Sequence, residues 1–137
     1  DVIDAMMKIH QYSIMCAPTV AQEAALEALK NGGNAMLEMK ESYRSRRGFF
    51  VRGLNDAGLQ CLLPHGAFYA FASVKNTGLS SEEFAEKLLR AEHVAVVPGE
   101  AFGPGGAGFI RCCYATSAEE LQEALIRIKR FVASLKG

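Results

Sequence analysis

Two serine–glutamate pairs constrain the fold of this chain more than any other feature of its sequence. Ser80 stands three residues before Glu83, Ser117 stands three residues before Glu120, and apolar residues at helical spacing follow each pair. In such a capping box the serine side chain accepts a hydrogen bond from a free backbone N–H, and the glutamate reaches back to the serine N–H. The pairs therefore predict an amphipathic helix directly after each serine, the first ending near residue 92.

Three short segments between turn residues predict β-strands. Residues 67–74, AFYAFASV, are rich in aromatic side chains and follow Pro64 and Gly66, which favours a mostly buried strand. Residues 93–97 form a short β-branched stretch, and residues 108–116 form another apolar stretch after a glycine-rich loop. These segments can supply a small sheet between the helices.

The N-terminal part of the sequence predicts two further helices. One begins at Pro18, which suits the first turn of a helix, and stops at the turn signal of residues 31–33. A second, long and amphipathic, starts with Asn34 as its N-cap and runs to about Gly58. Residues 1–16 are apolar and sulfur-rich without a clear period, so no element is assigned to them.

The order of elements from residue 34 is helix, strand, helix, strand, strand, helix. That order predicts an α/β fold of the α+β layer type, in which a small mixed β-sheet is covered by helices. With 137 residues, half of them hydrophobic, the chain can bury a real core. A composition shift at residues 32–33 separates an alanine-rich N-terminal piece from the compact remainder.

Charge and hydropathy argue against two classes of partner. Fifteen basic and fifteen acidic side chains cancel, so no large field is available to hold nucleic acid or an anionic membrane. No apolar run approaches the roughly 20 residues that a membrane helix needs, and the first residues, DVIDAMMKIH, lack the regions of a signal peptide. We therefore expect a cytoplasmic protein without nucleic-acid or membrane partners.

Neither the histidines nor the cysteines show metal-ligand spacing. The three histidines are far apart, and the cysteines lack a CxxC pair. Because cysteine is often fully buried, we interpret all four as reduced core residues, with the adjacent pair pointing to opposite faces of a strand. No metal site is predicted. The cysteines are Cys16, Cys61, Cys112 and Cys113.

Two other motifs have ordinary explanations. The loop of residues 98–108 contains a formal GxGxxG, but a predicted strand follows it, which is the wrong context for a dinucleotide. Its glycines instead let the backbone turn tightly or approach another surface. The basic stretch of residues 43–47 follows Glu38 and Glu41 at ion-pair spacing, so we interpret it as a solvated helix face rather than an RNA-binding surface.

Arg111 is the residue that packing explains least. It stands in the apolar stretch GFIRCCYAT and shares a strand face with Phe109. A guanidinium stays charged at any working pH, so it must either reach an edge of the sheet or meet an anion. Two anions stay open at this point: an internal acid such as Glu100, or the carboxylate or phosphate of a ligand.

Several segments stand in a fitting order along the chain: APTVAQEAALEAL, the long helix with YRSRR, PHGAFYAF, VAVVPGEAFG, and GFIRCCYAT followed by SAEELQEALIRI. Together they resemble the C-terminal part of fold-type I, pyridoxal-phosphate-dependent aminotransferases of class I/II, the branch with aspartate, aromatic and alanine transaminases. Each segment alone is weak evidence for the family. The resemblance is specific because PxGAFY, VxVxPGxxFG and the strand arginine occur together at fitting separations. The resemblance covers nearly the whole chain.

The resemblance implies a role for Arg111 in binding substrate. In such enzymes the matching arginine binds the α-carboxylate of the amino acid through two parallel hydrogen bonds. Gly66, Phe68 and Tyr69 are implied neighbours of the active site, beside a surface that closes over the substrate. The implied reaction moves an amino group between an amino acid and a 2-oxo acid, and the implied full-length enzyme is a homodimer.

The resemblance also divides the chain and locates the cofactor. It assigns residues 1–33 to the end of the large, pyridoxal-phosphate-binding domain and residues 34–137 to the small C-terminal domain. The Schiff-base lysine is expected upstream, so this chain is expected to be a fragment with no catalytic or cofactor-binding residue, inactive alone. None of its lysines has the family's sequence context; they are Lys8, Lys30, Lys40, Lys75, Lys87, Lys129 and Lys136.

Two other classes of function stay open. A free-standing, non-catalytic α+β module could bind a small carboxylate through Arg111. An interaction protein could present the apolar surface of residues 1–33 to a protein partner.

Overall fold

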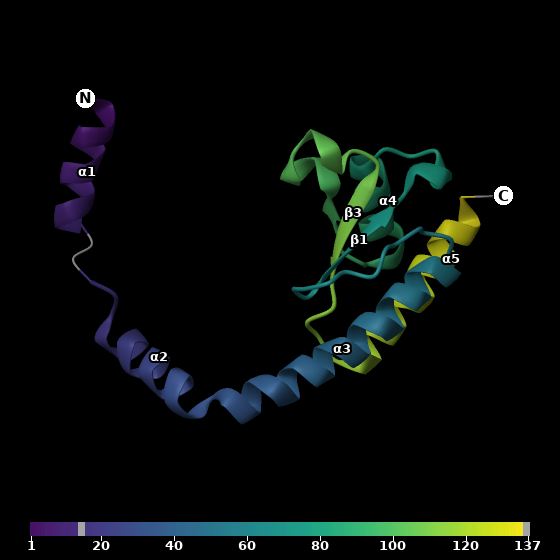
Figure 1. The fold of residues 1–137 in the computed structure, drawn as a ribbon. Helices are drawn as coiled ribbons and strands as arrows, with labels where there is room; N and C mark the ends of the chain where they lie inside the picture. The colour runs from purple at the N-terminus through teal and green to yellow at the C-terminus, as the bar shows by residue number, and fades with distance from the viewer. Residues whose placement is uncertain (14–15, 136–137) are drawn as a thin grey trace. The chain divides into compact units, whose positions relative to one another are not determined.

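The computed structural model describes residues 1–13 and 16–135, and contacts divide the chain into two units, with the division between Met39 and Lys40 (Figure 1). The first unit contains α1 (Val2–Ser13), α2 (Thr19–Asn31) and the start of α3 (Gly33–Asp56). None of its described residues is buried. The helix expected after Pro18 is confirmed as α2, and most of the unassigned N-terminal stretch forms α1.

The break between helices that was expected at residues 31–33 consists of one residue, Gly32, in the structure. α3 begins at Gly33, so Asn34 lies inside the helix and does not cap it. Gly32 keeps a right-handed helical conformation, with φ −76° and ψ −1°, and donates its N–H to the carbonyl of Ala28. A Cβ at this position would lie 2.5 Å from that carbonyl oxygen, so only glycine lets the two helices follow one another this closely.

The second unit holds a three-stranded sheet with the order β1-β3-β2. β1 (Tyr69–Ser73) pairs with β3 (Phe109–Cys113), and β3 pairs with β2 (Val97–Pro98). A small sheet covered by helices is confirmed. Both pairs of described strands are antiparallel, so the mixed strand directions that we expected are not found there.

The strand expected over residues 93–97 forms only at its last residue. His93 instead ends α4 (Ser81–Glu92) in the left-handed conformation, with φ 56°, and donates its N–H to the carbonyl of Leu89. A residue in this conformation turns the chain away from the helix axis. Val94 and Val96, which follow it, pack partly buried against the core instead of extending the sheet.

Helices pack against one face of the sheet and enclose the core (Figure 1). Ser80 forms a complete capping box with Glu83, as predicted. At the start of α5 (Ala118–Ser134) the Ser117 side chain accepts the N–H of Glu120, but the described hydrogen bonds do not include the return bond to the Glu120 side chain, so the second capping box is only half formed. Side chains from α3, α4 and α5 meet the inward-facing strand residues. The core residues include Leu54, Ala70, Ala72, Phe84, Leu88, Ile110, Cys112, Leu121 and Ile128.

The four cysteines are free, but only two of them lie in the core. Cys61 and Cys112 are buried, whereas Cys16 and Cys113 are exposed, which corrects the expectation that all four are core residues. The adjacent pair on β3 points to opposite faces of the sheet, as predicted. Burial raises the pKa of the Cys112 thiol to about 12, so it stays protonated at neutral pH.

Within residues 1–13 and 16–135, no helix is both long and apolar enough to cross a membrane. The same residues contain no group of three or more His, Cys, Asp or Glu side chains that could hold a metal ion. The histidines stand in different places along the chain: His10 in α1, His65 in the segment before β1, and His93 at the end of α4.

Candidate functional site

Arg111 lies at the middle of β3, the central strand of the sheet. In the strand register it stands opposite Phe71 of β1 and opposite Val97 of β2. Alternation puts it on the same face as Phe109, as predicted, while Ile110 between them points into the core. We call the face that carries Arg111 the outer face, because helices cover the other one. A permanent charge thus lies at the centre of an open, partly aromatic surface.

Two aromatic rings from different elements contact the guanidinium of Arg111. Its Cζ lies 4.3 Å from the ring centroid of Tyr69, on β1, and 4.3 Å from the ring centroid of Phe102, in the loop after β2. Both distances are well inside the range of an attractive cation–π contact. We call these two rings the aromatic clamp. Arginine commonly stacks a flat face of its guanidinium on an aromatic ring, and its N–H donors point outward in the guanidinium plane.

The loop that carries Phe102 is held by a close contact between two buried glycines. Gly99 begins one short 3₁₀ turn, Gly99–Phe102, and Gly106 ends the next, Pro104–Gly106. A Cβ on Gly99 would lie 2.1 Å from the carbonyl oxygen of Gly106, and a Cβ on Gly106 would lie 1.9 Å from that of Gly99. The glycines therefore let the loop pack backbone to backbone, one of the two roles predicted for them.

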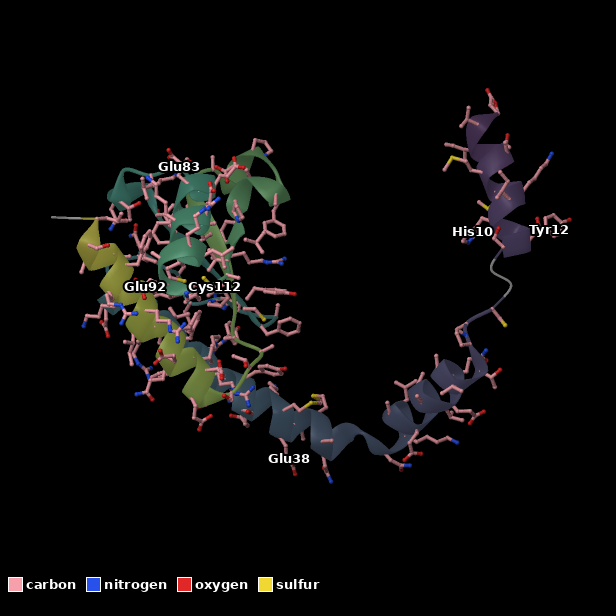
Figure 2. The ribbon with its side chains drawn as sticks, turned by 180° about the vertical axis from the view of Figure 1, so that it is seen from behind. His10, Tyr12, Glu38, Glu83, Glu92 and Cys112 are labelled. Carbon is pink, nitrogen blue, oxygen red and sulfur yellow. The ribbon has the colours of Figure 1, made fainter. Side chains whose placement is uncertain are left out.

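Arg111 forms no ion pair with any carboxylate of residues 1–13 and 16–135. Glu100, the internal acid that we considered, is exposed and has no ion pair there either. Other arginines do pair: Arg90 pairs with Glu86 at 2.7 Å, and Arg130 of α5 pairs with Glu92. Figure 2 labels Glu92, which lies at the end of α4. A half-buried guanidinium with free in-plane donors is suited to bind an anion from outside these residues.

The three neighbours expected from the resemblance lie at different distances from Arg111. Tyr69 contacts it directly, as part of the clamp. Phe68 lies one ring further away, with its centroid 4.7 Å from that of Tyr69. Gly66 lines a separate cavity of about 400 Å³ between the α3 surface and the segment before β1, and Arg111 is not among the residues that line it.

Phe102 is a site residue that the sequence reasoning missed. It belongs to PGEAFG, one of the segments that carried the resemblance, but the contact with Arg111 depends on how the loop folds back over β3. A single aromatic residue in a loop otherwise made almost entirely of small residues was the available signal.

A cavity of about 490 Å³ lies beside the clamp on the outer face and shares Tyr69 with it. Its wall is largely apolar, and Lys75 holds its ammonium 4.7 Å from the ring centroid of Phe109. A group bound by Arg111 would therefore have an apolar surface next to it. The cavity is lined by Gln60, Leu62, Pro64, Tyr69, Phe71, Ser73, Lys75 and Phe109.

The basic stretch of α3 is a solvated helix face only in part, because Arg47 is half-buried and donates from Nη1 to the carbonyl of Pro64 at 2.9 Å. Arg44 is exposed and pairs with Glu41, one turn earlier, at 2.8 Å. Arg46 lies over the ring of Tyr43, with 5.6 Å between its Cζ and the ring centroid. Local partners of this kind account for these charges without a polyanion.

The sequence matches a known family along most of its length. Residues 1–128 match the family model described as aminotransferase class I and II. A Bacillus subtilis (strain 168) protein named as an aminotransferase, YugH, is 64% identical over 129 residues, which cover 94% of this chain and 33% of that protein. The aspartate aminotransferase of Pyrococcus abyssi is 42% identical over 98% of this chain and 35% of its own length.

Solved structures agree with the sequence comparison. The crystal structure of an aromatic aminotransferase from Pyrococcus horikoshii OT3 superposes with a TM-score of 0.89 at 41% identity, over 98% of this chain and 36% of that chain. The fold described above is therefore shared with these proteins. This chain spans about a third of the length of the curated relatives that it matches.

Proposed function

This chain belongs to the class I and II aminotransferase family and corresponds to the C-terminal part of such enzymes, and from that premise we propose that it supplies their substrate-carboxylate site. The observation that carries the proposal is Arg111 on the outer face, with no carboxylate partner among the described residues and with its in-plane donors free. Its ligand is the α-carboxylate of an amino acid or of a 2-oxo acid.

Arg111 acts by positioning. Its planar fork donates two parallel hydrogen bonds to the two oxygens of one carboxylate, which sets the direction of the substrate as well as its place. A bound amino acid then presents its amino group in one orientation, and such orientation is itself a large part of catalysis. The chemistry between an amino acid and a 2-oxo acid is amino-group exchange.

The family normally uses pyridoxal phosphate, but the described residues do not form a site for it. A pyridoxal phosphate site needs a lysine amine close to a group that meets the pyridine nitrogen, commonly an aspartate. Lys40 and Lys75 are the lysines that line described cavities, and neither cavity has a carboxylate in its wall. Lys75 is also held over the ring of Phe109. We therefore assign cofactor binding to the rest of the full-length enzyme.

The proposal includes the expected division of that enzyme. Residues 1–33 belong to the large, cofactor-binding domain and residues 34–137 to the small domain, and the enzyme is a cytoplasmic homodimer. This division is supported by the exposed apolar side chains of the first unit, for example Ile3 at 76% and Ile9 at 69%, because surface of this kind is normally covered by other protein. Alone, this chain is inactive.

Replacement of Arg111 tests the proposal. In the full-length enzyme, Arg111→Lys is expected to weaken binding of both the amino acid and the 2-oxo acid by about tenfold to a hundredfold, because lysine cannot form the bidentate pair. Affinity would be measured by steady-state kinetics, with the absorbance of the bound cofactor as a check on folding. Arg90→Lys, at an exposed arginine of α4, is the matched control. Unchanged affinity in Arg111→Lys would refute the assignment.

A further inference from the structure

We propose that Tyr69 and Phe102 are positioning residues for Arg111: the aromatic clamp holds the guanidinium so that its in-plane N–H groups, and not its faces, meet the substrate carboxylate. This inference rests on the proposed function of Arg111 and adds to it the two side chains through which that function depends on the fold.

Both rings of the clamp lie equally close to the guanidinium. Each ring centroid lies 4.3 Å from Cζ of Arg111, and the rings come from elements far apart in sequence. A free arginine side chain occupies many rotamers and loses that freedom when it binds a ligand. Rings that already restrict the rotamers reduce this loss, which increases affinity without any new contact to the ligand.

Tyr69 is itself held by packing. It is the first residue of β1 and stands opposite Cys113 in the strand register. The Phe68 ring lies 4.7 Å from the Tyr69 ring, between centroids, and the Tyr43 ring of α3 lies 5.9 Å from the Phe68 ring. Tyr69 therefore meets Arg111 from a strand position with aromatic neighbours behind it.

Phe102 is held in place by its own loop and by a neighbouring ring. The buried contact between Gly99 and Gly106 closes the loop that carries it. Its ring also meets the ring of Phe71 edge-on, at 6.3 Å between centroids, and Phe71 stacks on Phe109 at 5.4 Å. A half-exposed aromatic side chain in a loop thus acquires a defined position over the central strand.

The clamp has a chemical consequence for ligand choice. With the rings against the faces of the guanidinium, as proposed, a ligand approaches along its edge, where pairs of N–H groups point the same way. A planar group with two equivalent acceptor oxygens fits that edge, and a carboxylate is such a group. The clamp therefore favours a carboxylate over a ligand that binds arginine by stacking.

The first test uses the 137-residue chain and acetate as the probe. Acetate is titrated while the NMR signals of the Arg111 side chain are followed, in the unaltered chain and in Tyr69→Leu and Phe102→Leu. We expect the Arg111 side-chain protons to lie upfield in the unaltered chain, because aromatic rings face them, and to move downfield in each leucine variant. The acetate dissociation constant should rise about threefold to tenfold in each leucine variant. In Tyr69→Phe and Phe102→Tyr, which keep an aromatic ring, it should equal that of the unaltered chain. Phe49→Leu, at a half-exposed ring of α3 outside the clamp, is the control.

The second test uses the full-length enzyme. The leucine variants should raise KM for the amino acid and for the 2-oxo acid about threefold to tenfold while kcat changes less than twofold, because they alter binding and not the reacting atoms. Leucine variants that bind acetate normally, while Arg111→Lys binds it weakly, would overturn the clamp and leave the proposed function standing. Normal binding by Arg111→Lys would overturn both. An unaltered chain without upfield Arg111 signals would overturn the clamp even if the variants failed to fold.

Discussion

The two faces of the sheet differ in the type and the exposure of their side chains. On the inner face, alternate residues of β1 and β3 are small or aliphatic and have almost no exposure: Ala70, Ala72 and Ile110 are 0% exposed. On the outer face most of the intervening residues are aromatic or charged, and they stay partly open, with Phe71 at 38%. The same two strands thus provide packing on one side and a recognition surface on the other.

This difference shows how a short strand can carry a charge without a buried partner. Arg111 stands between Ile110 and Cys112, both of which are buried, and yet it avoids the core because strand side chains alternate. The inner face contributes stability through burial of apolar surface. The outer face contributes little of that and instead holds one guanidinium in place.

The sharpest test of the comparison is thiol labelling of two adjacent residues. In the native 137-residue chain, Cys113 on the outer face should react with a thiol reagent at least about a thousandfold faster than Cys112 on the inner face, which becomes accessible only when the core opens. Burial, which raises the pKa of Cys112 to about 12, also keeps that thiol protonated. Rates would be followed by peptide mass mapping, with exposed Cys16 and buried Cys61 as internal controls. Equal rates would mean that the two faces are not distinct in solution.

A substitution on each face should separate stability from recognition. Ile110→Ala should lower the free energy of unfolding by about 2–4 kcal/mol, because it leaves a cavity in a fully buried site. Cys113→Ala, on the outer face of the same strand, should change it by no more than about 0.5 kcal/mol. Both would be measured by urea denaturation of the chain. A comparable loss from the two substitutions would contradict the assignment of the inner face as the stabilising one.

A smaller effect on stability is expected at the start of α4, where Glu83 belongs to neither face of the sheet. The carboxylate of Glu83 accepts hydrogen bonds from the backbone N–H and the hydroxyl of Ser80, which hold its pKa below the ordinary value of 4.5. A lowered pKa in the folded state gives stability that is present above the ordinary value and is lost as the pH falls through the folded-state pKa. Urea midpoints of the unaltered chain should therefore fall as the pH drops below the ordinary value of 4.5.

Glu83→Gln should show a smaller fall over the same range, because an amide has no proton to gain. Glu82→Gln, one residue earlier in the same turn, is the control and should behave like the unaltered chain. A pH dependence unaltered by Glu83→Gln would remove the capping box as its source.

Local patterns predicted the helices well. The capping serines located the starts of α4 and α5, because a cap depends on residues only three positions apart. Alternation placed Arg111 and Phe109 on one face of β3 and separated Cys112 from Cys113. The resemblance to class I/II aminotransferases, built on segments in order, is confirmed by the comparisons.

The failures of prediction have a shared cause. The strand expected over residues 93–97 is mostly absent because His93 takes up the left-handed conformation that ends α4, and β-branched composition does not reveal this. Asn34 suits an N-cap, but Gly32 lets the helices follow so closely that no cap is needed. In both cases the backbone conformation at the end of the preceding helix decided the outcome, and residue composition does not reveal that conformation.

For this protein, the sequence by itself determined most of the helices and strands, which residues of β1 and β3 face inward, and which arginine carries the unexplained charge. Only the tertiary structure decided what surrounds that charge. Phe102 meets Arg111 because two glycines lack a Cβ and allow a loop to close, and Tyr69 meets it because β1 pairs with β3 in one register. Periodicity acts within a few residues, whereas these contacts join parts of the chain far apart in sequence, and only the packing of a complete core specifies them.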